Sequence, residues 1–172
     1  MWTRHESLYI YISPTLNALD KIENIACFDL DWTLVKPKSS KFPKNFSDNI
    51  IMTNRVKILK DLIKMDFTIV IFTNQKVTSR ESLQDKIKRM QDIISKFESN
   101  EITVILLMAT EEDKYRKPHT GMWLYLNSLL RGIKNGFYCG DAAGRPNDFS
   151  DSDLMFAKNI GMAFHLPEDV FK

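Results

Sequence analysis

Two aspartates, Asp29 and Asp31, stand at the end of the apolar run 25–30. Alternate side chains of an extended chain point the same way, so both carboxylates would face one side. Carboxylates this close raise each other's proton affinity, which can leave one protonated and the other ionised near neutrality. Such a pair can supply a nucleophile and a general acid/base for phosphoryl transfer. The same residues could instead form an Asx turn after a strand.

Polar residues also follow the later apolar runs of the chain, namely Thr73, Asn74, Lys117 and Asp141. In open parallel sheets the ligand site lies beyond the carboxyl ends of the strands, so we expect these residues at one crevice. Hydroxyl, amide and ammonium groups suit a phosphate, and carboxylates suit Mg²⁺. Taken singly, Thr73 could equally cap a turn and Lys117 could lie on the surface.

Apolar runs alternate with amphipathic segments along the chain. The runs cover residues 25–30, 67–72, 102–108 and 136–140, and more weakly 161–165. Helical spacing is present in residues 56–63, 83–97 and 122–130, with Ser79, Ser82 and Pro118 at helix starts. This alternation predicts an α/β fold with a Rossmann-like doubly wound parallel sheet in three α/β/α layers. We also expect an added edge strand at 8–12 and a polar excursion over 36–53.

The segment Asp29-Leu30-Asp31-Trp32-Thr33 matches the DxDxT signature of the haloacid dehalogenase superfamily. Residues 72–75, 115–123 and 140–146 resemble the phosphatase domain of polynucleotide kinase/phosphatase. The resemblance extends over about 24–171 of a chain that we expect to form one domain, 1–172. DxDxT alone indicates the superfamily, whereas the other stretches are specific to the nucleic-acid 3′-phosphatase branch. The resemblance implies a haloacid dehalogenase-like fold.

The resemblance also implies roles for individual residues. Asp29 would be the nucleophile and Asp31 the general acid/base. Thr73 would hydrogen-bond the phosphoryl oxygens with support from Asn74, and Lys117 would neutralise charge on the aspartyl-phosphate.

Mg²⁺ would be held by Asp29, the backbone carbonyl of Asp31, and Asp141. The remaining candidate phosphate or substrate contacts are Thr33, Arg116 and Arg145, although either arginine could pair with a nearby acid instead.

Three further positions have open interpretations. Relatives often carry glycine where this chain has Trp32, whose ring could stack on a base or pack beneath a loop, and we favour packing. We expect Asp151 to cap a helix. Asp153 could do the same or could support the metal site. Relatives often place a second acid at the position of Arg145, so we expect Asp141 to be the acidic ligand from its loop.

Cys139 and Arg145 have the Cys-x5-Arg spacing of cysteine phosphatases. Asp141 would put a negative charge inside that anion cradle, and a thiol in a buried strand keeps a high pKa. We therefore favour an ordinary core role for Cys139. Cys27 and Cys139 each precede an aspartate by two residues, so we expect the two thiols to lie close together without forming a disulfide.

The composition sets broad limits. With 172 residues, 44% of them hydrophobic, and a net charge of +2, the chain suits a globular domain. The basic clusters 36–44 and 86–89 could be solvated or could contact a phosphate backbone.

There is no signal-peptide pattern and no apolar run of about 18 residues, so we expect a soluble intracellular protein, nuclear or cytoplasmic, with no membrane partner. No GxxxxGK[ST] loop occurs, so we expect no kinase half and no nucleotide cofactor.

These observations predict a Mg²⁺-dependent polynucleotide 3′-phosphatase that acts through an aspartyl-phosphate in strand-break repair. Its partners would be nucleic-acid ends, with DNA favoured over RNA, and a monomer is favoured. The alternatives are a phosphatase of small sugar or nucleotide phosphates, and an end-binding module without catalysis.

Overall fold

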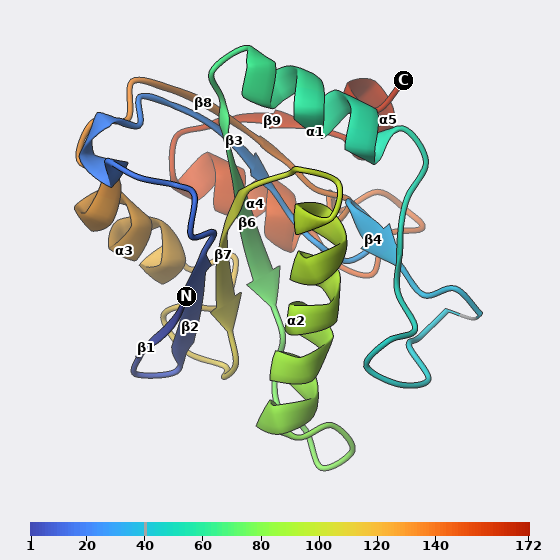
Figure 1. Ribbon diagram of the computed structural model, residues 1–172. Coiled ribbons are helices and arrows are strands. Elements are labelled where there is room, and N and C mark those ends of the chain that lie inside the picture. The colour runs from blue at the N-terminus through green and yellow to red at the C-terminus, as the bar shows by residue number, and fades with distance from the viewer. Residues whose placement is uncertain (40) are drawn as a thin grey trace.

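A seven-stranded sheet forms the centre of the molecule in the computed structural model, which describes residues 1–39 and 41–172 (Figure 1). In spatial order its strands are β1 (Trp2–His5), β2 (Leu8–Ile12), β7 (Val104–Ala109), β6 (Thr68–Asn74), β3 (Asn24–Phe28), β8 (Asn135–Cys139) and β9 (Ala163–His165). The five strands from β7 to β9 run parallel, and β2 and β1 continue the sheet in antiparallel pairing. The predicted α/β fold with a mainly parallel sheet is confirmed. The segment 8–12 is a strand, but β1 covers it, so the prediction of an edge position was wrong.

Helices cover both faces of the sheet. They are α1 (Arg55–Lys64), α2 (Leu83–Glu98), α3 (Gly121–Leu130), α4 (Ser152–Asn159) and α5 (Pro167–Val170), with a 3₁₀ turn η1 at Leu19–Lys21. Apolar residues of α1 and α2 pack in one core cluster, whereas α3 and α4 pack in a second cluster on the opposite face. The result is three α/β/α layers. In the described chain, no helix combines the length and apolar character needed to cross a bilayer.

The helix starts follow local capping chemistry. Ser82 caps α2 in a reciprocal capping box with Asp85, so of the two candidate serines Ser82 is the cap. The prediction that Pro118 lies in the first turn of α3 was wrong, because that helix begins at Gly121. The preceding loop is instead held to the sheet by Asn74, whose Oδ1 accepts from the Lys117 amide at 2.9 Å.

The polar excursion after β3 forms a small two-stranded sheet and a loop. Its strands are β4 (Val35–Lys36) and β5 (Ile50–Ile51), and residue 40 between them lies outside the described residues. The buried Asp48 carboxylate accepts from the amides of Lys38 at 3.1 Å and Lys44 at 3.0 Å. These bonds close the loop on itself.

The register of β3 against β8 contradicts the prediction that Cys27 and Cys139 lie close together. Cys27 is paired with Tyr138, and Phe28 is paired with Cys139. A stagger of one residue turns neighbouring side chains to opposite faces. The two free thiols therefore lie in different core clusters.

Candidate active site

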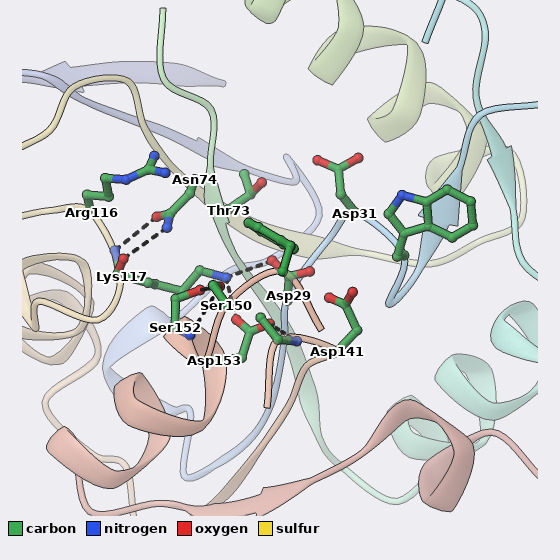
Figure 2. Close-up of a pocket in the computed structure, with 13 residues that line it drawn as sticks. Asp29, Asp31, Thr73, Asn74, Arg116, Lys117, Asp141, Ser150, Ser152 and Asp153 are labelled. Atoms are coloured by element: carbon green, nitrogen blue, oxygen red, sulfur yellow. Dashed lines mark hydrogen bonds and ion pairs between the residues drawn. The ribbon is translucent and has the colours of Figure 1, made fainter. Parts of the chain in front are cut away.

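A cavity of about 250 Å³ opens where the parallel strands end. Seven of the predicted site residues line it: Asp29, Asp31, Thr73, Asn74, Arg116, Lys117 and Asp141. Figure 2 shows these side chains reaching the cavity from separate strand ends and loops. Thr33 and Arg145 lie nearby but do not line it.

Asp29 follows β3, and its carboxylate is almost fully buried at the base of the cavity. Its Oδ1 accepts from Lys117 Nζ at 2.6 Å. Lys117 is itself only 3% exposed and reaches Asp29 from the loop before α3. The sheet and the loop therefore place a cation directly beside the candidate nucleophile.

Asp153, on α4, is the second partner of this lysine. Its Oδ1 accepts from Lys117 Nζ at 2.7 Å and from the Tyr138 hydroxyl at 2.8 Å, and its Oδ2 accepts from the Ala142 amide at 3.0 Å. A side chain on Gly140 would collide with this carboxylate, so the glycine makes the close approach possible. The structure thus excludes a capping role for Asp153 and shows it holding Lys117 in place.

Asp151 is the N-cap residue of α4, as we expected, although its side chain does not accept a capping hydrogen bond.

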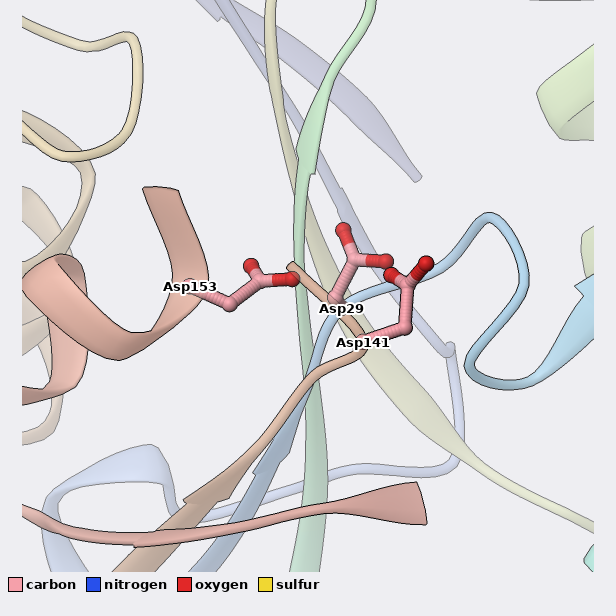
Figure 3. A group of neighbouring side chains, drawn as sticks. All are labelled: Asp29, Asp141 and Asp153. Atoms are coloured by element: carbon pink, nitrogen blue, oxygen red, sulfur yellow. The ribbon is translucent and has the colours of Figure 1, made fainter. Parts of the chain in front are cut away.

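Three carboxylates, those of Asp29, Asp141 and Asp153, each offer an oxygen, and these oxygens lie within 4.8 Å of one another (Figure 3). Burial raises the pKa of Asp29 well above its usual value, and Asp153 raises it further while Lys117 opposes the rise. Burial and Asp153 also raise the pKa of Asp141, to about 6. Hard oxygen donors that repel one another fit a divalent cation, which would offset their negative charge.

Lys117 stays protonated in this setting. Burial alone would lower its pKa, but the charges of Asp153 and Asp29 outweigh that effect and raise it.

Asp31 differs from our expectation. Its carboxylate turns away from Asp29 (Figure 2). It is paired with the Arg89 guanidinium from α2. Burial would raise the pKa of Asp31, but the charge and hydrogen bonds of Arg89 outweigh it and lower the pKa. The idea that Asp29 and Asp31 raise each other's proton affinity was therefore wrong, because Asp153 and Asp141 are the acids that act on Asp29.

Thr73 and Asn74 end β6 beside the nucleophile. Thr73 is 1% exposed, and its hydroxyl accepts from Gln75 Nε2 at 2.8 Å. The same amide nitrogen donates to Asp31 Oδ2 at 2.7 Å. Asn74 bonds the backbone of Lys117 in both directions, with its Nδ2 donating to the carbonyl oxygen at 3.0 Å. Asn74 therefore positions Lys117, and Gln75 links Thr73 to Asp31.

The other predicted contacts are mostly engaged within the protein. Thr33 is fully buried and donates to Asp141 Oδ1 at 3.4 Å. Arg116 lines the cavity and lies 3.4 Å from Glu112. Arg145 pairs with Asp148 at 2.9 Å and with Glu168, so it braces the loop after β8.

Trp32 lines the cavity and is 41% exposed, which contradicts the packing interpretation. Its backbone has φ of 62°, the left-handed region that favours glycine. A tryptophan there carries a backbone cost of about 1–3 kcal/mol.

A second cavity of about 690 Å³ adjoins the first and shares Asp31, Trp32, Asn74, Asp141 and Phe149 with it. The exposed Lys41 and the loop prolines line its outer side, and Lys86 and Arg89 line its α2 side. The solvated-surface interpretation was wrong for Lys86 and Arg89, which are 8% and 4% exposed and are ion-paired. The lysines of 36–44 are exposed, which agrees with both solvation and contact with a phosphate backbone.

The cysteine alternative fails on geometry. Cys139 is fully buried inside β8, and burial raises the pKa of its thiol. Arg145, which would complete the anion loop, is bound to carboxylates instead.

Sequence reasoning missed Arg89, Gln75 and Tyr138 as parts of this site and left Asp153 undecided. One signal was available for Asp153: it precedes Phe156 and Ala157 by three and four residues, so all three share a helix face. Both apolar residues are buried, and a carboxylate on that face needs a partner.

Solved structures share this fold. A HAD-like phosphatase from Mesorhizobium loti superposes with a TM-score of 0.75 at 13% identity, covering 94% of this chain and 79% of that one. A D,D-heptose 1,7-bisphosphate phosphatase from B. bronchiseptica gives a TM-score of 0.64 at 18% identity, covering 83% and 79%.

Sequence comparisons are more specific. The chain is 39% identical over 180 residues to a bifunctional polynucleotide phosphatase/kinase of Schizosaccharomyces pombe, covering 99% of this chain and 42% of that protein. It is 31% identical over 211 residues to a polynucleotide 3′-phosphatase of Saccharomyces cerevisiae, covering 86% and 87%. The chain thus spans less than half of its bifunctional relative. A sequence model described as Polynucleotide kinase 3 phosphatase matches residues 24–171, and the chain belongs to that family.

Proposed function

We propose that this chain removes 3′-phosphates from nucleic-acid ends, as a single catalytic domain that depends on Mg²⁺. The observation that carries the proposal is the buried Asp29 carboxylate, placed between Lys117 at 2.6 Å and the Asp141 and Asp153 carboxylates. A carboxylate held beside a fixed cation and a metal-binding donor set can attack a phosphoryl group. Membership of a 3′-phosphatase family supports the same conclusion.

In the first step the Asp29 carboxylate forms a bond to phosphorus while the bond from phosphorus to the 3′-oxygen breaks. The pKa of Asp31 is lowered in the free protein, so Asp31 first takes up a proton from solvent as the negative charge of the substrate raises its proton affinity. It then passes that proton to the leaving oxygen. In the second step water attacks phosphorus, the bond to Asp29 breaks, and the water proton passes to Asp31. Lys117 balances the negative charge near Asp29 in both steps.

Asp29, Asp141 and the Asp31 carbonyl would hold the metal, because both oxygens of Asp153 already have hydrogen-bond partners. Mg²⁺ fits these hard oxygen donors and supplies charge neutralisation for the phosphoryl oxygens. The heptose bisphosphate phosphatase with this fold was solved with magnesium and phosphate.

A nucleic-acid strand fits the second cavity better than a small sugar phosphate does. At about 690 Å³ it extends from the edge of the first cavity toward Lys41, and the exposed Trp32 ring lines both cavities. Bases stack on such rings, and lysine attracts phosphates. We favour DNA over RNA as substrate, a monomer as the active form, and nuclear or cytoplasmic strand-break repair as the setting.

A substrate panel tests the function directly. With Mg²⁺ we expect phosphate release from a 3′-phosphorylated oligonucleotide, and little release from a 5′-phosphorylated oligonucleotide, a mononucleotide or a sugar phosphate. EDTA should lower the rate about 100-fold or more, because the carboxylates would then repel the phosphoryl group, and excess Mg²⁺ should restore it. Faster turnover of the small phosphates, or full activity in EDTA, would contradict the proposal.

Replacing Trp32 tests the contact with the strand. Trp32→Gly should raise KM for the oligonucleotide about tenfold, because a stacked base loses its platform. KM for p-nitrophenyl phosphate should not change, and the thermal midpoint should hold or rise as the φ of 62° becomes unstrained. Trp32→Phe keeps a ring and is the matched control. An unchanged oligonucleotide KM in Trp32→Gly would remove Trp32 from substrate binding.

A further inference from the structure

We infer that Arg89 is a positioning residue for the reaction, which holds the Asp31 carboxylate where proton transfer requires it. The inference rests on the proposed function, since it assigns Arg89 to the general acid/base of that reaction. Arg89 lies on α2, 58 residues from Asp31 along the chain. Its guanidinium meets the carboxylate with two nitrogens: Nη1 lies 3.3 Å from Oδ2, and Nη2 donates to Oδ1. A two-pronged contact of this kind restricts both the position and the rotation of a carboxylate.

Two further residues hold the Arg89 guanidinium in place. Its Nε donates to Asn49 Oδ1 at 2.9 Å, and its Nη1 lies 3.4 Å from Gln75 Oε1. Asn49 is fully buried, and its Nδ2 donates to the Phe46 carbonyl at 2.7 Å. Arg89 therefore joins α2 and the loop before β5 to the turn that carries Asp31.

Arg89 lines the second cavity, but it is only 4% exposed while 37% of the Asp31 side chain is accessible, so we infer that it acts through Asp31 rather than on the substrate. Gln75 completes the arrangement, donating to both Asp31 Oδ2 and Thr73 Oγ1. The carboxylate is thus held by Arg89 and Gln75 on one side while it lines the cavity on the other. Misplacing a proton-transfer group by a fraction of an ångström is costly to rate.

A double-mutant cycle tests this inference with Arg89→Met, Asp31→Asn and the combined variant. Arg89→Met should lower kcat on the 3′-phosphorylated oligonucleotide about 30-fold and leave KM within about twofold, because ground-state binding does not use Asp31. In the Asp31→Asn background the same change should have almost no effect, because the group that Arg89 positions is already gone. Lys88→Met, which removes an exposed charge from the same helix, is the matched control.

Two results would overturn the inference: an equal loss of kcat from Arg89→Met in both backgrounds, or no loss from Asp31→Asn alone. If Arg89→Met does not fold, Arg89→Lys carries the test. Lysine keeps the positive charge but cannot contact both carboxylate oxygens as the planar guanidinium does. Arg89→Lys should therefore lower kcat about fivefold with KM unchanged. Unchanged kcat in Arg89→Lys would then overturn the inference.

Running the same cycle with p-nitrophenyl phosphate separates this inference from the proposed function. If the protein hydrolyses the aryl phosphate but not the oligonucleotide, the proposed function is wrong. The double-mutant cycle on the aryl phosphate then still tests whether Arg89 positions Asp31. With this substrate the leaving group needs no proton, so the burst of nitrophenol should persist in Arg89→Met while steady turnover slows. A slowed burst with normal steady turnover would count against the positioning role.

Discussion

Replacing Asp29 with asparagine is expected to abolish turnover, lowering kcat by a factor of about 10⁴ or more. An amide cannot form the bond to phosphorus, so no aspartyl-phosphate accumulates. The fold should survive, because the change removes one of three mutually repelling carboxylates and Lys117 keeps its 2.7 Å bond to Asp153. Phosphate release measures the loss of turnover. Trapping of acid-stable labelled phosphate on the protein measures the loss of the aspartyl-phosphate.

Cys139→Ser is the matched control for Asp29→Asn. The thiol is buried in β8 and does not line the cavity, so the serine variant should keep most of its activity. The opposite pattern, with an active Asp29→Asn variant and an inactive Cys139→Ser variant, would establish a cysteine nucleophile and contradict the proposed mechanism.

Replacing Lys117 with methionine is expected to cost both activity and stability. It leaves the Asp29 and Asp153 carboxylates buried without the ammonium that lies 2.6 and 2.7 Å from them. Breaking a buried ion pair costs about 3–5 kcal/mol. The rate should fall about 10³-fold because the charge near the nucleophile is no longer balanced. Thermal unfolding and kcat report the two losses.

A second substitution separates these losses. In Lys117→Met/Asp153→Asn one buried charge is also removed, so stability should partly recover while activity stays low. Lys114→Met is the control, since that lysine is 62% exposed and pairs with Glu6 at the surface. A stable and active Lys117→Met would show that the buried lysine has no part in the reaction.

Much of this protein was determined by local sequence. Apolar runs 25–30, 67–72, 102–108 and 136–140 predicted β3, β6, β7 and β8 to within a few residues, because strands buried on both faces need continuous apolar side chains. The polar residues that interrupt or follow these runs had to lie at one edge of a parallel sheet. That rule brought Asp29, Thr73 and Asp141 together, and family resemblance supplied their expected roles.

Tertiary structure decided what depends on register and on packing between distant segments. The one-residue stagger of β3 on β8 separated Cys27 from Cys139, and no local pattern encodes such a stagger. Arg89 reached Asp31 only because α2 packs beside that turn, and Asp153 reached Lys117 only because Gly140 leaves room for α4. Sequence periodicity determines which face a residue occupies within its own element. Its partner across the site depends on how elements far apart in the chain pack together, and that packing lowered the pKa of Asp31 and set the exposure of Trp32.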